Sequence, residues 1–423
     1  YPVSKYFWIK SDSSFLTSQA ETYYTDTSSY LAKYFKGNFD SLLSKKVFTE
    51  DGRTVCEVLT KNPAAASYKK VRIFLNGDTS YHIFISTTAS YINTENNNRF
   101  FRELTFKEPD HSGIIYTSKT GLIIKDLHSS DSLTRAKARE AVDVAPFSKE
   151  DIPLLYSAYL DRFPVDSNDY RNTNEIIGAA ISKLGDSSLV EFIRSGYSKA
   201  SGEHAVLKMD MLRMLATMKT QESYRLLKEL LIASPPAEGK IFSFVSALED
   251  SMQLARSLFP EAKKLYSDSL IGPGILKLAV EMVDSNLVEK DILTSNKKGI
   301  IDLSDSQLRH MKKSEYNYAD FSLSVVDALK KINDEESNKQ LYKYISMPQM
   351  FLKEAAVIGL LENNKTVPAT ELYKMAADTS ERVDLYISMK KIGKQKQYPK
   401  EFLTQKKFAE SYLYTSMSED DET

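Results

Sequence analysis

The chain has 423 residues, and its 42% hydrophobic content is ample for two or three domains with packed cores. Its 56 basic residues nearly balance its 57 acidic residues, which argues against nucleic acid as the main partner. No 18-residue stretch is uninterruptedly apolar, so the sequence predicts no transmembrane segment. The single cysteine, Cys56, excludes an internal disulfide framework and any metal site built on several cysteines.

The first 43 residues predict two short strands and a helix. Residues 6–9 and 15–16 are apolar and flank a polar segment, which is typical of a strand, a turn and a second strand. Residues 25–43 predict a helix, because Leu31 and Phe35 share a helical face with two tyrosines.

Residues 46–49, 53–60, 68–75 and 81–87 then predict an antiparallel meander. Gly52 and the Asn76-Gly77 pair lie between strands, where a tight turn needs residues that accept positive φ. Apolar residues alternate along residues 71–75, so we expect one face of this strand in the core. Residues 93–102 predict another helix, and the aromatic segment 100–106 is interpreted as a strand-like end.

This order of elements resembles the PsbP-like α/β sandwich over residues 23–109. The resemblance rests on residues 70–75, the Asn76-Gly77 turn, residues 81–83, and the segment from Arg99 to Phe106. Such modules are mostly accessory or binding domains, so the resemblance implies assistance to a larger assembly and no catalytic residue. Similar tails occur in large envelope proteins of Bacteroidota, which implies that an N-terminal part is missing here.

Residues 133–413 form a ladder of amphipathic helices separated by short polar joints. Successive joints lie 40, 34, 30, 35, 49, 29 and 31 residues apart, which is the length of a helical hairpin. The longest step contains a loop-like stretch, residues 295–320. The joints begin at Val144, Leu184, Met218, Leu248, Val283, Ile332, Leu361 and Ile392.

Apolar residues within the steps keep helical phase, as in the set from Leu207 to Met218, and Asp334 is placed to cap a helix. Each hairpin alone would leave an apolar face in water, so neighbours must stack. The pattern resembles HEAT-type repeats, although an irregular helical bundle stays open as the alternative. The expected fold is an α+β domain followed by a HEAT-like α-solenoid.

The expected organisation is an α/β sandwich at residues 1–110, a linker at 111–131, a solenoid at 132–416 and an acidic tail at 417–423. The chain starts at Tyr1 without a methionine, so we expect a processed product or a piece of a longer protein.

The sequence contains no motif for a phosphate loop, a zinc protease, a nucleophile elbow or a Cys/His metal site. His111 and His128 share one segment, but exposed loop histidines are favoured over a metal site there. Cys56 lies in a predicted strand, where a buried thiol is favoured over a nucleophile. We therefore predict no enzyme activity, no catalytic residues, no cofactor and no metal.

Lysines cluster near the C-terminus and alternate with aromatic residues. A solvated face of the last hairpin, with its aromatic rings inside, is the favoured interpretation. The cluster is nevertheless the local candidate for binding a polyanion or an acidic partner. Its members are Lys390, Lys391, Lys394, Lys396 and Lys400.

The sequence thus predicts a non-catalytic protein–protein interaction scaffold, or an accessory subunit of a larger assembly that is associated with the envelope or a membrane complex. The alternative is the accessory region of a multidomain enzyme whose catalytic domain is absent from this chain. The expected partner is a protein rather than nucleic acid. The expected compartment is the periplasm or envelope of a bacterium, with the cytoplasm as the alternative.

Overall fold

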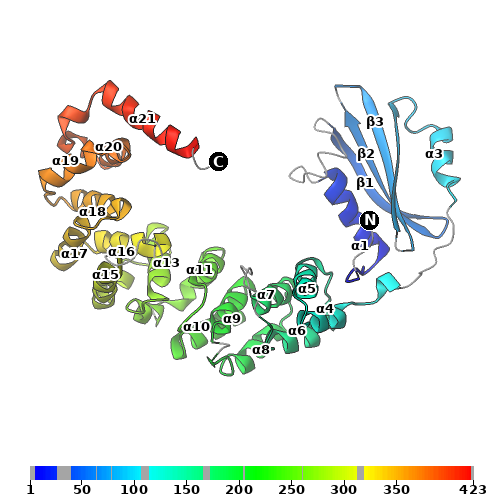
Figure 1. Cartoon of the computed structure of the whole chain (residues 1–423), viewed down its shortest axis with the longest axis horizontal. Helices are drawn as coiled ribbons and strands as arrows, with labels where there is room; N and C mark the ends of the chain where they lie inside the picture. Colours follow the sequence, from blue (N-terminus) through cyan, green and yellow to red (C-terminus); the bar gives the residue numbers. More distant parts are fainter. Residues whose placement is uncertain are drawn as a thin grey trace. The chain divides into compact units, whose positions relative to one another are not determined.

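The computed structural model describes residues 5–25, 40–62, 64–77, 79–105, 114–164, 172–202, 205–259, 261–311 and 319–420. The chain divides into two compact units, Tyr1–Leu184 and Gly185–Thr423. The first unit holds an antiparallel sheet and several helices, and the described part of the second is helical (Figure 1). The predicted fold class, an α+β region followed by helical repeats, is confirmed. The predicted boundaries at residues 110, 131 and 416 stay predictions.

The sheet is a four-stranded meander in the order β1 (Ser41–Glu50), β2 (Arg53–Asn62), β3 (Ser67–Asn76) and β4 (Thr79–Thr88). Asp51 and Gly52 join the first two strands with φ values of 49° and 76°. A two-residue turn with both φ positive matches the twist of the strands beside it. Gly77 has a φ of 64°, so the two predicted hairpin turns form where glycine allows them.

Both faces of β3 are buried, whereas the sequence predicted only one. Helix α1 (Asp12–Ala20) covers the face that carries Cys56 and Ile73. Helix α3 (Glu95–Arg102) covers the other face, where the Phe101 ring lies over the Arg72 guanidinium. Arg72 is buried there because Glu57 and Glu50 accept hydrogen bonds from it at 3.0 and 2.6 Å.

Three local predictions are wrong in this unit. The two short strands at residues 6–9 and 15–16 do not form: residues 12–20 are α1, because Ser11 caps the helix and Leu16 and Ala20 bury one face against the sheet. The helix predicted at 25–43 cannot extend to its end, since β1 starts at Ser41. Its residues 26–39 lie outside the described residues.

The strand-like interpretation of residues 100–106 is also wrong, because α3 continues to Arg102 and buries Phe101. The predicted linker at 111–131 contains α4 (Thr120–Leu127), which packs on α5 (Ser132–Val144). The predicted loop at 295–320 contains α15 (Lys297–Met311), because its apolar residues keep helical phase.

Helical hairpins stack in both units. In the first unit, α5 packs on α7 (Thr173–Leu184), and α4 packs on α6 (Ile152–Tyr159). In the second unit, neighbouring helices pack along one row and a parallel row covers it (Figure 1). The first row comprises α9 (Leu207–Thr217), α11 (Ile241–Glu249), α13 (Gly272–Asp284), α16 (Ala319–Ile332), α18 (Met350–Glu362) and α20 (Arg382–Lys391). The second row includes α8 (Ser188–Gly196), α10 (Gln221–Ala233), α15, α17 (Glu335–Ile345) and α19 (Ala369–Ala377).

Successive joints lie side by side and are connected by lysines. In the first unit, Lys183 Nζ donates to the carbonyl oxygen of Asp143 at 3.3 Å, 40 residues earlier. In the second unit, Lys331 pairs with Asp284, and Lys394 donates to Asn364 at 2.7 Å. These separations match the repeat steps, so the contacts give the register of stacking. Lys219–Asp250 and Lys330–Glu362 connect further neighbouring joints, and Lys277, in the middle of α13, pairs with Glu249 at the joint after α11.

Several joints also reverse the chain through a residue with positive φ. Gly185, Asn333, Asn364 and Gly393 have φ values between 53° and 70° and lie one or two residues after the end of a helix. Glycine and asparagine accept this conformation at the lowest cost and close the last helical turn. The sequence signal for the joints therefore has a backbone cause.

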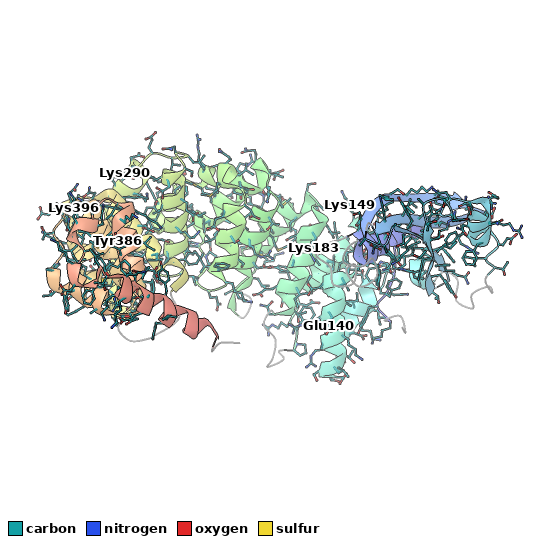
Figure 2. The ribbon with its side chains drawn as sticks, turned by 90° about the horizontal axis from the view of Figure 1, so that it is seen from above. Glu140, Lys149, Lys183, Lys290, Tyr386 and Lys396 are labelled. Carbon is teal, nitrogen blue, oxygen red and sulfur yellow. The ribbon has the colours of Figure 1, made fainter. Side chains whose placement is uncertain are left out.

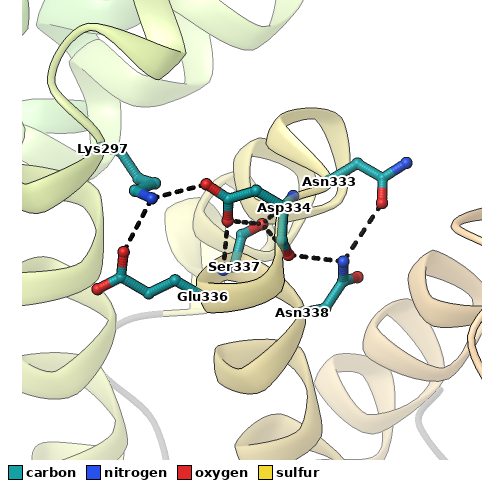
Figure 3. A network of polar contacts seen from close by, with 6 residues as sticks. All are labelled: Lys297, Asn333, Asp334, Glu336, Ser337 and Asn338. Carbon is teal, nitrogen blue, oxygen red and sulfur yellow. Dashed lines mark hydrogen bonds and ion pairs between the residues drawn. The ribbon is translucent and has the colours of Figure 1, made fainter.

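Asp334 connects the joint between α16 and α17 to α15 (Figure 3). Its carboxylate caps α17 by accepting from the Ser337 N–H at 2.8 Å. It also pairs with Lys297 of α15 at 2.6 Å, and Lys297 reaches Glu336 at 2.8 Å. Burial alone would raise the pKa of Asp334, but Lys297 and Ser337 outweigh it and lower the pKa to about 2.

We expect Asp334→Ala to reduce the free energy of unfolding by about 1 kcal/mol, because both the cap and the ion pair are lost. Asp334→Asn keeps a capping oxygen and should lose less. Because the folded-state pKa is lowered, the contribution is present above the ordinary pKa near 4 and disappears as the pH falls towards 2. Urea unfolding of the three proteins at pH 6 and pH 3 measures this. A difference between wild type and Asp334→Asn that does not shrink at pH 3 would contradict it.

Candidate protein-binding surface at the C-terminal hairpin

The predicted lysine cluster lies on the last hairpin of the second unit. After α19 and α20, the chain forms two 3-10 turns, η7 (Gln395–Gln397) and η8 (Lys400–Phe402), and then α21 (Gln405–Asp420). Gly393, with a φ of 70°, lies two residues after the end of α20, and Pro399 directly precedes η8. Glycine and proline thus set the path of the segment that carries the lysines.

Arg382 holds this hairpin together from inside. Its side chain is 3% exposed, and its guanidinium donates to the carbonyl oxygens of Ala376, Ala377 and Lys407 at 2.8, 3.0 and 2.9 Å. The first two carbonyls end α19, where the helix dipole favours a positive charge. The Phe402 ring lies 5.4 Å from the guanidinium carbon. One side chain therefore fixes α19, α20 and α21 to one another.

Tyr398 adds a second internal bond. Its ring is buried, and its hydroxyl donates to the carbonyl oxygen of Arg382 at 3.1 Å. Burial raises the pKa of Tyr398 to about 12, so the hydroxyl keeps its proton at neutral pH. Phe402 is buried as well, as the sequence predicted for the aromatic residues of this segment.

Four of the five predicted lysines share this hairpin as exposed side chains: Lys390 and Lys391 end α20, Lys396 lies in η7 and Lys400 starts η8 (Figure 2 labels Lys396). Among the described residues, no carboxylate forms an ion pair with these four. Lys394 differs, because its Nζ donates to Asn364 and it is part of a joint. The dipole of α20 favours the positive charges of Lys390 and Lys391 at its C-terminal end. It gives no such reason for Lys396 and Lys400.

The same hairpin also carries exposed apolar side chains, and sequence reasoning missed them. Tyr373 of α19 is 49% exposed and lies edge-on to Phe402, with ring centroids 5.3 Å apart. Leu403 and Tyr414 are exposed beyond it. We define the C-terminal surface as Tyr373, Lys390, Lys391, Lys396, Lys400, Leu403 and Tyr414.

The other residues considered for chemistry lie in separate places. Cys56 is buried in the sheet core, where burial raises the pKa of its thiol. His82 contacts the Tyr24 hydroxyl at 3.2 Å, and burial lowers the pKa of His82. His128 lies 3.3 Å from an Asp161 oxygen. His111 lies outside the described residues.

The described residues contain neither a metal site nor a membrane-spanning helix. Within the described ranges, His, Cys, Asp and Glu side chains form no group of three or more that could hold a metal ion. In the same ranges, the helices are too short or too polar to cross a membrane.

Comparison with known proteins places the chain in no family. No protein-family model matches it, and no curated protein matches it significantly. One solved structure is "The structure of the complex of CpcE and CpcF of phycocyanin lyase from Nostoc sp. PCC7120". A chain of that complex matches with a TM-score of 0.29 and 13% identity, over 68% of this chain and 99% of that chain.

This comparison contradicts the prediction that the chain is not an enzyme, because the matched structure belongs to a lyase. We therefore withdraw that prediction. At this TM-score the likeness assigns no lyase activity to this chain, and the C-terminal surface rests on its own geometry.

Proposed function

We propose that the chain is a protein-binding accessory subunit, or scaffold, of a larger assembly, and that its C-terminal surface binds an acidic partner protein. One observation carries this: the hairpin that Arg382 fixes carries both exposed apolar side chains and lysines that have no ion-pair partner among the described residues. Aromatic anchors supply binding energy at protein interfaces, whereas surrounding charges speed association and select the partner.

The envelope is the compartment we propose, supported by composition and by the resemblance of the first region to PsbP-like accessory modules. The boundaries at residues 110, 131 and 416 belong to the same proposal. Cross-linking of the tagged chain in native cells, followed by affinity capture and mass spectrometry, tests the surface. Lysines 390, 391, 396 and 400 should carry most cross-links to a reproducible protein partner. Cross-links concentrated in the first unit would overturn the assignment of the surface.

Replacing the four lysines of the C-terminal surface with glutamate should weaken partner binding at least tenfold at low salt. The expected reason is that opposite charges at an interface become like charges, which costs several kcal/mol. The affinity of the wild-type chain should also fall with added salt, and that dependence should be lost in the variant.

The matched control changes four other exposed lysines of the same unit to glutamate, at positions Lys199, Lys264, Lys290 and Lys298. It alters net charge equally and should leave affinity within about twofold. Isothermal titration with the captured partner measures both variants. Equal weakening by the two variants would mean that net charge, not this surface, attracts the partner.

A further inference from the structure

A groove of about 1000 Å³ lies within the first unit, between α5 and the segment that leads into α1. Its walls are mainly apolar and include Phe7, Trp8, Phe15 and Val144. It is open to solvent along one side. Nothing in the second unit contributes to it.

The walls of the groove are fixed. Ile9 N–H donates to the carbonyl oxygen of Ile115 at 2.8 Å, and Lys5 and Tyr6 both donate to Asp126 of α4, at 2.6 and 2.9 Å. The Trp8 ring packs edge-on against Phe147, with centroids 5.7 Å apart, and Phe7 packs on Phe15 in the same way. A site with such supported walls is preorganised, so binding need not order them first.

Val144 indicates what is missing from the groove. It is the apolar residue that closes α5. Of the corresponding residues at the other joints, three are buried (Leu248, Ile332 and Leu361) and four are partly buried (Leu184, Met218, Val283 and Ile392). Val144 is 82% exposed. α5 packs on α7 on one side, and the groove occupies the place where a preceding hairpin would put its helix.

The groove is large enough for a helix, and its open side distinguishes a helix from a small molecule as the occupant. Three helical turns are about 16 Å long and 10 Å across with side chains, which is roughly 1200 Å³. A helix can leave its polar face in water, whereas small-molecule pockets enclose about 70–90% of a ligand. The open side of this groove therefore favours an amphipathic occupant.

The charged residues at the rim of the groove indicate which charge its occupant carries. Lys10 and Lys137 line the groove as exposed side chains, and Glu140 of α5 is the carboxylate among the lining residues (labelled in Figure 2). Lys5 also lines it but pairs with Asp126. The net positive rim complements carboxylates beside the apolar stripe of a helix.

We propose that this groove binds an amphipathic, acidic helix of a partner protein, which packs on α5 as one more helix of the repeat and covers Val144. The proposal rests on the proposed function, because it supplies a second contact for a protein partner. The groove lies in the first unit, whereas the C-terminal surface lies in the second. An experiment can therefore reject the groove proposal without rejecting the proposed function.

The test uses the full chain and two synthetic 18-residue helical peptides without tryptophan. Both carry the same leucine stripe, flanked by glutamates in one peptide and by lysines in the other. Trp8 is the single tryptophan of the chain and lines the groove, so its fluorescence reports occupancy. We expect the glutamate peptide to bind and to shift Trp8 emission, and we expect the lysine peptide to bind at least about tenfold more weakly.

Val144→Asp should lower the affinity of the chain for the glutamate peptide at least tenfold. Leu133→Asp is the matched control, since Leu133 is 62% exposed on the same helix but does not line the groove, and it should have no effect. Lys137→Glu should lower the affinity for the glutamate peptide and raise the affinity for the lysine peptide. Lys125→Glu on α4 should change neither affinity. Far-ultraviolet circular dichroism checks that each variant is folded.

Several outcomes would overturn the proposal. Absence of binding by either peptide, or equal binding to Val144→Asp and wild type, would reject a helix in the groove. A Trp8 response to sodium oleate but to neither peptide would assign the groove to a small amphiphile. Self-association of the chain that Val144→Asp abolishes, seen by light scattering, would assign it to a second copy. In each case the variants of the C-terminal surface still test the proposed function independently.

Discussion

Replacing Arg382 with methionine is expected to lower the stability of the last hairpin by about 3 kcal/mol. Methionine keeps most of the apolar stem but donates no hydrogen bond, so three backbone carbonyl oxygens lose their donor. The favourable charge at the end of α19 is lost as well. Native-state hydrogen exchange of α19 to α21 should show faster opening, and amides of α8 to α11 should change little, because repeats couple mainly to neighbours.

Arg382→Lys separates charge from geometry. Lysine keeps the charge but lacks the planar guanidinium, so it can donate to fewer of the carbonyl oxygens. The stability of Arg382→Lys should therefore lie between those of wild type and Arg382→Met. Lys391→Met, at an exposed position of the same helix, should stay within about 0.5 kcal/mol. Unchanged exchange in Arg382→Met would mean that the hairpin is held by its aromatic packing instead.

Replacing Gly274 with valine is expected to destabilise the second unit by about 3 kcal/mol. A Cβ at position 274 in α13 would lie 2.5 Å from Val245 Cγ2 and 3.2 Å from Ile241 Cγ1, both in α11. Valine at position 245 is stiff about χ1 and buried, so it cannot rotate away without a clash elsewhere. The two helices would have to separate, and urea unfolding should report the loss.

A control variant and a double-mutant cycle test whether the close approach of α11 and α13 is the cause. Gly121→Ala in α4 is the control, because a Cβ there meets nothing within 4 Å, and it should be neutral or stabilising by up to about 1 kcal/mol. The pair Gly274→Ala and Val245→Ala should cost less together than the sum of the two single variants, since the second removes the methyl that the first collides with. Additive losses would exclude close approach of the helices as the reason for glycine.

The repeat could be predicted from the sequence because its signals are local. Apolar residues at helical spacing give each helix, and residues such as Asn333 and Gly393 mark the joints by accepting positive φ. α1 could not be predicted in this way. Its sequence is rich in serine, and the helix is stabilised by Leu16 and Ala20 against strands that lie more than thirty residues later.

The candidate surfaces also combine residues that the local sequence reveals with residues that only tertiary packing brings together. The lysines of the C-terminal surface are consecutive enough to be seen in the sequence. Tyr373 joins them from another helix, and Lys394 leaves them because its partner, Asn364, lies 30 residues earlier. The groove is harder still, since Trp8 and Val144 line it from opposite ends of the first 150 residues and neither has a local pattern. Only tertiary packing brings such residues together.

We expect the lysine contacts between neighbouring repeats to contribute to the stiffness of the second unit. Each contact spans neighbouring repeats only, and several of the lysines and carboxylates are partly exposed, so counterions can weaken them without loosening the apolar layers beneath. Stretching the second unit between its ends should therefore meet a resistance that falls as salt is raised, while the force that unfolds single hairpins stays nearly constant. The joints thus contribute to the stiffness of this unit, and the buried rows set its strength.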